Sequence, residues 1–465
     1  MKVQIIYKML LALTVLLLGA CNNAGPTEQS ISKLGLLRVA ILENPHIDFA
    51  NNRVGGYEID LLQAYAEKLG VRLATTYVSS EAALRGLVTS RKVHLGLGML
   101  PVLKNTKRFK YGPSIANSDL ILVTHTDAAL VKKNLQLAEL SIAAQRREIA
   151  NNPFTDDSKT DFEPVVLEHS DASALLKLVE QDVFDGAIVS AIDFELLKRQ
   201  HPNLKKNYTL RKSVPFAWLT ANPATALRKS MNNFIAEHAQ NHYTEKRWAF
   251  HYDHLSGFDF VDARKFLQRY AKVLPKYRAE FQAAAAEHDF DWRLLAALSY
   301  QESHWDPSAV SPTGVQGLMM LTRNTAKELG VSRLDPSESI EGGTRYLANL
   351  QSRLPAKVDE QDQPLMALAA YNVGFGHLRD AQRVAKAENK DDGEWQIVKA
   401  HLPLLNKKKY ASKVRYGRAR GVQAVHYVEG VRRYFSMLRL LEPETLPNET
   451  PAAQLPIGEN LFALF

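Results

Sequence analysis

The hydrophobic pattern of this chain changes near its middle, and that change limits the folds open to it. Between about residues 36 and 236, short apolar runs such as Leu37–Ile41 and Leu73–Val78 alternate with amphipathic stretches such as Ile59–Leu69. Strands and helices in alternation are typical of a doubly wound α/β sheet. From about residue 266 onward the periodic segments are helical, so the sequence predicts a multidomain protein whose two main regions differ in fold class.

The α/β half divides into two sets of elements. A first set runs from residues 37 to 124, and a second set runs from Leu140–Ala144 to Gly186–Ala191. The strand expected at Phe216–Leu219 and the helix expected at Ala224–His238 then return to the first set. A chain that crosses between two sets in this way predicts two α/β lobes.

The second half predicts a mainly helical domain. Its segments show the helical apolar period, they are separated by Gly, Pro and Asn, and no strand-like alternation is present. The expected helices are Phe266–Leu274, Arg278–His288, Trp292–His304, Asn324–Gly330, Ile340–Ser352, Pro364–Tyr371 and Tyr427–Leu441.

Composition and charge exclude several classes of protein. The 465 residues are 46% apolar, and 24 Gly with 20 Pro are too few for a collagen-like or low-complexity chain. One cysteine excludes a disulfide scaffold, and the fourteen histidines show no ligand spacing with Asp or Glu, so no metal or other cofactor is expected. The net charge of +8 is mild and evenly spread, which argues against nucleic acid as a partner.

The single cysteine follows a segment that predicts export. Lys2 and Lys8 precede Met9–Ala20, an apolar run that would rise about 18 Å as a helix and cannot cross a bilayer core of about 30 Å. A basic start, a short apolar run and small residues at its end are typical of a secretory signal. Cys21 is then either an accidental residue or a lipidation site.

Leu18–Cys21 resembles the bacterial lipobox, and this resemblance implies acyl chains on Cys21. Each buried methylene of such a chain adds about 0.8 kcal/mol of membrane affinity. Asn22 rather than Asp follows the cysteine, which implies the periplasmic face of the outer membrane. The expected divisions are a signal peptide at 1–20, an α/β domain at 21–266, a helical domain at 267–442 and a loose tail at 443–465.

Parts of the α/β half resemble the family-3 periplasmic solute-binding fold. The resemblance lies in Gly56–Leu61, Leu84–Gly98 and Tyr111–Pro113. It implies two lobes that close on an amino acid or small peptide. The family's carboxylate-binding arginine has no clear counterpart in Lys104–Lys110.

The second expected ligand contact of that family is also displaced. The position five residues after Asp185, where the family has an aspartate, is Ser190, and Asp193 stands three residues further on. A muropeptide or cell-wall peptide, a free amino acid, and a docking or regulatory role without a ligand therefore stay open for this domain.

One carboxylate of the helical half stands where an apolar residue is expected. From Leu295, the spacing i, i+3, i+7 reaches Leu298 and then Glu302. Because burying an unpaired charge is costly, Glu302 is either paired with an arginine or has a raised pKa that lets it donate a proton near neutral pH. Asp306 precedes Pro307 and is expected to be a cap or turn residue.

Four linked elements extend this observation over about 125 residues. They are Glu302-Ser303, Gly314-x-x-Gly317-Leu318-Met319, Tyr371-Asn372-x-Gly374 and Tyr427-Val428. Their order and spacing resemble the lytic transglycosylase domain of the soluble murein transglycosylase type, although Met320 stands where Gln is typical. Together with the solute-binding fold and the export signal, they resemble the membrane-bound lytic murein transglycosylase F family, in which Met is usual at that position.

The resemblance implies a lyase that acts on the glycan strands of peptidoglycan. Glu302 would protonate the oxygen between N-acetylmuramic acid and N-acetylglucosamine, and then take the proton of the 6-hydroxyl that closes a 1,6-anhydro ring. The substrate's own acetamide would support the oxocarbenium-like centre, and no water would be consumed. The expected substrate-binding residues are Ser303, Gly314, Gly317, Leu318, Met319, Met320, Tyr371, Asn372 and Tyr427, of which Met319, Met320 and Tyr427 are equally compatible with the helical core.

Two alternatives remain for the helical domain. A hydrolase with two carboxylates needs a second acid about 5–9.5 Å from the first, and Asp306 is the neighbouring candidate. A sensor would bind peptidoglycan without cutting it. In addition, Lys407–Arg420 holds seven basic residues and no acid, which is typical of a solvated face or of a surface that attracts the anionic groups of peptidoglycan.

Overall fold

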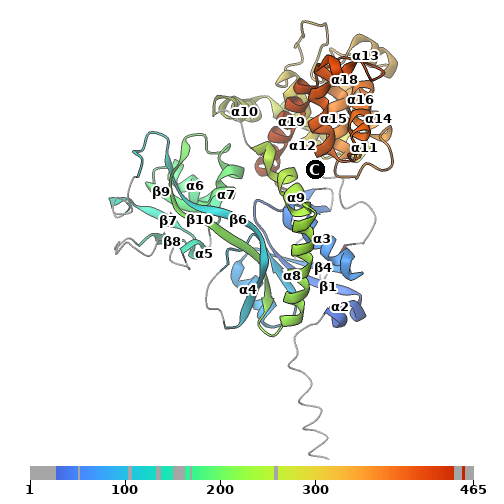
Figure 1. Ribbon diagram of the computed structural model, residues 1–465. Coiled ribbons are helices and arrows are strands. Elements are labelled where there is room, and N and C mark those ends of the chain that lie inside the picture. The colour runs from blue at the N-terminus through green and yellow to red at the C-terminus, as the bar shows by residue number, and fades with distance from the viewer. Residues whose placement is uncertain are drawn as a thin grey trace, which may run out of the picture.

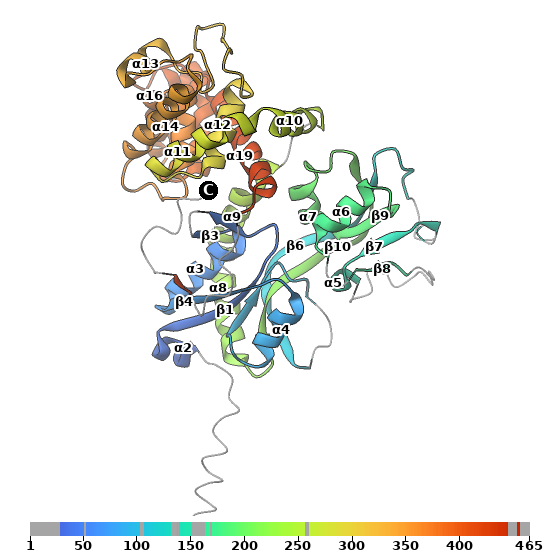
Figure 2. The ribbon, with the colours of Figure 1, turned by 180° about the vertical axis from the view of Figure 1, so that it is seen from behind.

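The computed structural model describes residues 28–444 and 453–455, apart from residues 51–52, 103–106, 132–136, 138, 150–162, 168–169 and 256–259. The expected signal peptide, Cys21 and most of the expected tail lie outside these residues. Within them, none of the helices combines the length and the apolar character that crossing a bilayer requires. An α/β region and a separate helical region are evident in two opposite views (Figure 1 and Figure 2).

One mixed sheet runs through the α/β region. Its strands are β1 (Leu36–Leu42), β4 (Arg72–Val78), β5 (Leu95–Leu97), β6 (Phe109–His125), β7 (Ile142–Ala144), β8 (Val165–Val166), β9 (Gly186–Ser190), β10 (Leu204–Ala221) and β11 (Ala453–Leu455). Among the described residues they lie in the order β11-β4-β1-β5-β10-β6-β9-β7-β8, and β2 (Asp48–Ala50) pairs separately with β3 (Arg53–Gly55). β1 is parallel to β4 and β5, and β7 is parallel to β8 and β9, so each lobe has its own parallel core.

Two long antiparallel strands, β6 and β10, join the lobes. Leu219 of β10 pairs with Gly96 in the first lobe, whereas Leu120–Thr124 of β6 pair with β9 in the second lobe. The register of the pair shifts between Arg211 and Val214, where both strands pass between the lobes. The sequence predicted only their apolar segments, because the crossing segment is half-exposed and largely polar.

Helices cover both faces of the lobes. The helices of this region are α2 (Glu28–Leu34), α3 (Tyr57–Leu69), α4 (Glu81–Thr89), α5 (Arg146–Ile149), α6 (Ala172–Glu180), α7 (Ala191–Leu197), α8 (Thr225–Gln240) and α9 (Tyr243–Tyr252). In β1, Val39 and Ile41 pack with α3 and α8, whereas Ala40 and Leu42 pack with α4. This alternation follows from the two-residue period of a strand.

The helical region is built around one large apolar core. Its elements are η2 (Asp253–Leu255), α10 (Phe260–Lys272), η3 (Leu274–Lys276), α11 (Arg278–His288), α12 (Trp292–Ser303), α13 (Arg323–Leu329), α14 (Pro336–Ser352), α15 (Gln363–Val373), α16 (Phe375–Ala387), α17 (Trp395–His401), η4 (Leu402–Asn406), α18 (Lys408–Ala411) and α19 (Gly421–Leu441). The expected fold classes of both regions are confirmed, and the expected boundary at 266/267 falls inside α10.

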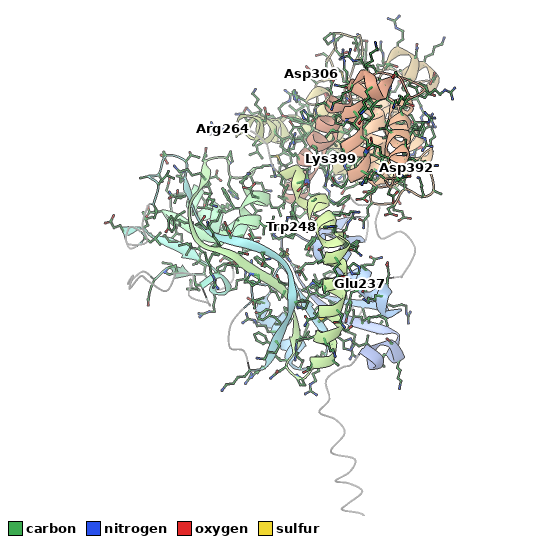
Figure 3. The ribbon with its side chains drawn as sticks, in the orientation of Figure 1. Glu237, Trp248, Arg264, Asp306, Asp392 and Lys399 are labelled. Atoms are coloured by element: carbon green, nitrogen blue, oxygen red, sulfur yellow. The ribbon has the colours of Figure 1, made fainter. Side chains whose placement is uncertain are left out.

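Helix α19 contacts both regions. Near its middle, a Cβ added to Gly430 would lie 2.0 Å from the Oε1 of Gln301, so α12 and α19 approach closely there. Further along, Arg432 donates to the carbonyl of Phe250, and Ser436 lies 2.8 Å from the Nε2 of His254. Figure 3 shows Trp248 of α9 close to this junction.

Candidate active site

Glu302 lies in the last turn of α12. The helix begins at the carboxylate of Asp291, which accepts the N–H of Arg293 at 2.8 Å. The apolar face of the helix, with Leu295 and Leu298 fully buried, fixes its rotation in the core. The predicted periodicity is therefore confirmed, and it leaves Glu302 half-buried on the same stripe.

The neighbour of the Glu302 carboxyl is a tyrosine hydroxyl. Tyr427 of α19 donates a hydrogen bond to its Oε1. Burial raises the pKa of Glu302 to about 7, and the Tyr427 bond opposes this rise. Within the part of the chain that the structure describes, no arginine or lysine is paired with Glu302. The structure therefore supports the second interpretation of Glu302, an acid without a paired arginine and with a raised pKa.

A serine pair ties the loop between α12 and α13 to α12. The hydroxyls of Ser299 and Ser303 lie 3.1 Å and 2.8 Å from the carbonyl oxygen of Leu318. The Ser303 hydroxyl donates its proton to backbone carbonyls, so its oxygen can take part in further hydrogen bonds only as an acceptor. Leu318 and Met319 are fully buried, and in this conformation neither side chain is open to a substrate. Met320 is half-buried.

Glycines shape the same loop. Gly317 has φ 85°, and a Cβ added there would lie 1.8 Å from the carbonyl oxygen of Arg333, so no larger residue fits. Gly314 also has a positive φ of 80°, but it is exposed and has open space around it. Gly317 thus has a steric requirement that Gly314 lacks.

The end of α15 forms another wall. The Tyr371 hydroxyl donates to the carbonyl of Met319 at 2.7 Å, and burial followed by the charge of Glu302 raises the pKa of Tyr371 well above its usual value. The Asn372 side chain is exposed, and Gly374 ends the helix with φ 90°. The structure therefore brings Glu302, Tyr371 and Tyr427 together, with the backbone of the glycine loop between them.

Asp306 has a local structural role. Its Oδ1 accepts the backbone N–H and the hydroxyl of Ser308 at 2.9 Å and 2.7 Å, and these bonds lower its pKa. The prediction of a turn residue is confirmed, and Figure 3 shows Asp306 at the outer part of the helical region.

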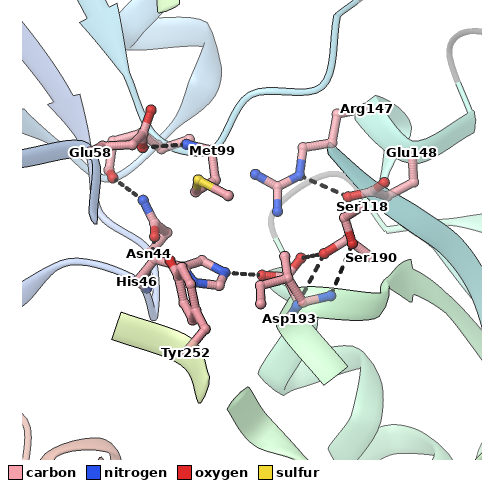
Figure 4. A network of polar contacts seen from close by, with 12 residues as sticks. Asn44, His46, Glu58, Met99, Ser118, Arg147, Glu148, Ser190, Asp193 and Tyr252 are labelled. Carbon is pink, nitrogen blue, oxygen red and sulfur yellow. Dashed lines mark hydrogen bonds and ion pairs between the residues drawn. The ribbon is translucent and has the colours of Figure 1, made fainter. Parts of the chain in front are cut away.

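A second polar cluster lies between the two lobes (Figure 4). His46 follows β1, and its Nε2 lies 2.8 Å from the Oδ1 of Asp193, in the first turn of α7. The hydroxyl of Ser190 donates to the other oxygen of Asp193 at 2.6 Å, and the hydroxyl of Tyr252 lies 3.1 Å from the Nδ1 of His46. All four side chains are buried. Both lobes and α9 therefore meet in one hydrogen-bonded chain.

Charged groups extend this cluster into the second lobe. The Arg147 guanidinium lies 3.3 Å from a Glu148 oxygen, beyond the end of β7. Burial raises the pKa of Glu148 to about 7 against the effect of Arg147. For Asp193, burial is outweighed by the hydrogen bond and charge of His46, helped by Arg147, and its pKa falls below the usual value.

Sequence reasoning named Ser190 and Asp193 but missed His46 and Arg147. Both missed residues follow the carboxyl end of a parallel strand, where the crevice of an α/β sheet lies. Polar residues directly after the apolar runs Leu37–Ile41 and Leu140–Ala144 were the available indication.

Known proteins match the helical region by itself and the chain over most of its length. Residues 279–412 match the family described as the Transglycosylase SLT domain. The membrane-bound lytic murein transglycosylase F of Shewanella halifaxensis is 34% identical over 439 residues, which cover 91% of this chain and 90% of the relative. The protein of the same name from Aeromonas hydrophila is 36% identical over 448 residues, covering 94% and 90%.

Among solved structures, an amino acid ABC transporter substrate-binding protein from Streptococcus pneumoniae bound to L-arginine is 16% identical with a TM-score of 0.42, covering 50% of this chain and 100% of its own. The two bacterial relatives, by contrast, match through the α/β and the helical regions alike. With at least 34% identity over nine-tenths of its length, this chain belongs to the membrane-bound lytic murein transglycosylase F family.

Proposed function

We propose that this protein cleaves the bond between N-acetylmuramic acid and N-acetylglucosamine in peptidoglycan, with Glu302 as general acid and then as general base. The single observation that carries the proposal is the half-buried Glu302 carboxyl, which has a tyrosine hydroxyl and, in the described part of the chain, no cation beside it. Such a group keeps its proton near pH 7 and can still lose it during a reaction.

The reaction balances with this one group. Glu302 gives its proton to the glycosidic oxygen, the bond from that oxygen to C1 of the muramic residue breaks, and the substrate's acetamide supports the positive charge at C1. The Glu302 carboxylate then takes the proton of the 6-hydroxyl while O6 bonds to C1. Glu302 ends protonated, the product has a 1,6-anhydro ring, and no water is consumed.

The surrounding residues have supporting roles in this proposal. Tyr427 orients the carboxyl, and Asn372 offers an exposed amide at the end of α15. The loop between α12 and α13 is held in place by Ser303, Leu318 and Met319. Their side chains face the core, so their role is to position the loop. The half-buried Met320 offers an apolar surface to a sugar face.

The test is mass spectrometry of sacculi digested by the wild type and by Glu302→Gln. The proposal expects muropeptides lighter by one water than hydrolysis products, and none from the variant. Products with a reducing end would instead indicate a hydrolase, and Asp306→Asn would then be tested. Sacculi that are bound but released intact by the wild type would indicate a sensor.

A lipid anchor on Cys21 is proposed to hold the protein at the periplasmic face of the outer membrane. The relatives are named membrane-bound, and Leu18–Cys21 carries the lipobox pattern. Cell fractionation of Cys21→Ser is expected to move the protein from the outer-membrane fraction to the soluble periplasm. Unchanged fractionation would contradict the anchor.

The crevice between the lobes is proposed to bind a muropeptide or cell-wall peptide and to alter access to Glu302. The half-buried Arg147 and the buried Asp193 are groups of opposite sign, which suit a ligand with a carboxylate and an ammonium. Calorimetry with a stem peptide is expected to give binding that Asp193→Asn weakens. Absence of binding to the wild type would exclude this ligand.

A further inference from the structure

An uncompensated positive surface lies on the segment between α17 and α19. We call residues 407–420 the basic loop; it contains α18 and no acidic residue. None of its cations forms an ion pair with another residue that the structure describes. Its exposed basic residues are Lys407, Lys408, Lys409, Lys413, Arg415, Arg418 and Arg420.

A buried carboxylate fixes the conformation of this loop. Asp380 of α16 is fully buried, and its two oxygens accept the backbone N–H groups of Arg415 at 3.2 Å and Tyr416 at 2.7 Å. The cations around this point are therefore held by the fold rather than carried on a loose chain. A pre-organised set of charges loses less entropy on binding than a flexible one.

The basic loop borders the candidate active site. The ring of Tyr416 packs on Gly376, where an added Cβ would lie 2.9 Å from the ring. Gly376 lies at the start of α16, four residues after Asn372. The residue before Asn372 is Tyr371, which lines the Glu302 site. Tyr416 is also 52% exposed, so this edge of the site is open to a large ligand.

The chemistry of the substrate supplies a matching charge. Stem peptides extend from the muramic residues of a glycan strand and carry several free carboxylates. A strand bound at Glu302 would present these carboxylates beside the site rather than at the reacting bond. Clustered cations at such an edge attract anions before contact and hold them after it.

We propose that the basic loop binds the carboxylates of stem peptides, so that the enzyme prefers peptide-bearing strands over strands without peptides. This rests on the proposed function, because it assumes that the glycan occupies the Glu302 site. The basic loop acts on substrate binding and takes no part in proton transfer.

The test compares two charge-reversal variants of the full chain, each in a Glu302→Gln background. The loop variant carries Lys413→Glu, Arg415→Glu and Arg418→Glu, and the control carries three exposed lysines of the α/β region changed in the same way, Lys177→Glu, Lys212→Glu and Lys229→Glu. Both have the same net charge. Cosedimentation measures their binding to peptide-bearing strands and to the same strands with amidated carboxylates.

The loop variant is expected to bind peptide-bearing strands about tenfold more weakly than the control at low salt, and both are expected to bind amidated strands equally. Added salt should reduce the difference by screening. Equal binding to peptide-bearing strands, or an equal loss on amidated strands, would overturn the proposal. So would a loop variant that keeps its strand binding and loses only its binding to phosphatidylglycerol vesicles, which would assign the basic loop to a lipid surface.

Failure of the proposed function is distinguishable from failure of this inference. Binding is measured with the Glu302→Gln background and does not depend on cleavage. If wild-type Glu302 yields no anhydro product, the proposed function fails while the binding comparison stands. If the product forms and the loop variant binds normally, only the inference on the basic loop fails.

Discussion

Glu302 and Asp193 are two carboxylates withdrawn from water on helices of one chain, and their pKa values move in opposite directions. Burial raises the pKa of both, but Asp193 has His46 and Arg147 beside it, whereas Glu302 has, among the residues that the structure describes, the hydroxyl of Tyr427 and no arginine or lysine. Burial therefore raises the pKa of Glu302 to about 7, whereas the neighbours of Asp193 outweigh burial and lower its pKa.

The positions of the two carboxylates on their helices shift their pKa values in the same two directions. Asp193 lies in the first turn of α7, where the helix dipole stabilises a negative charge, and its backbone N–H is bonded to the capping Ser190. Glu302 lies in the last turn of α12, where the dipole disfavours a negative charge. Asp193 thus joins the two lobes of the α/β region through its contact with His46, whereas the Glu302 carboxyl of the helical region has a raised pKa.

Removal of the proton donor should have the largest effect. Glu302→Gln keeps the shape and can still accept the Tyr427 hydrogen bond, so the fold should survive while turnover falls about 10³-fold. The rate of anhydro-muropeptide release measures this. Asp306→Asn is the matched control, expected to stay within about twofold because Asp306 only forms a turn. Equal losses in both variants would remove the distinction between these acids.

The second-largest effect is expected from disruption of the glycine loop between α12 and α13. Gly317→Ala places a methyl group against the Arg333 carbonyl and should lower the stability of the helical region by about 3 kcal/mol or more. Gly314→Ala has the same positive φ without the clash, and should cost about 1 kcal/mol. Thermal unfolding of both variants checks this, and similar melting points would show that the steric argument is wrong.

Tyr427→Phe tests the hydrogen bond that the Glu302 carboxyl accepts. The hydrogen bond from Tyr427 lowers the pKa of Glu302, so its loss should raise that pKa further above 7. A general acid works below its pKa, and the alkaline fall of the pH–rate profile should therefore move to higher pH, with about a tenfold lower rate from misorientation. Tyr371→Phe should leave the midpoint in place, since its hydroxyl bonds a backbone carbonyl. A shift to lower pH in Tyr427→Phe would contradict this assignment.

His46→Ala should have the smallest effect on turnover, because the stability that it removes is that of the α/β region. The lowered pKa of Asp193 means that its carboxylate, with the hydrogen bond to His46, contributes stability above about pH 4, and this contribution is lost as the pH falls through the folded pKa. Unfolding of this region should cost about 1–3 kcal/mol less in the variant at neutral pH, and the difference should shrink in acid. The pH–rate midpoint of Glu302 should not change, and a change would mean that the two acids are coupled.

The sequence was sufficient for features set by local pattern. The period of Trp292–Ser303 predicted both α12 and the position of Glu302 on its apolar stripe. Contacts between distant parts of the chain could not be predicted from the sequence. His46 contacts Asp193 across 147 residues, whereas the family spacing counted from Asp185 pointed to Ser190 as the ligand-binding position. The family resemblance implied that Leu318 binds substrate and left Met319 open between substrate and core. Both side chains are buried, because the turn of the loop decides which way they face.

Infrared difference spectroscopy between the wild type and Glu302→Gln tests the central claim most directly, because it reports the protonated carboxyl of Glu302 itself. Spectra would be taken from about pH 5 to about pH 9, a range that brackets the raised pKa. We expect a carboxylic acid band that disappears with a midpoint at about pH 7. A carboxylate already ionised throughout this range, as for an ordinary glutamate, would contradict it.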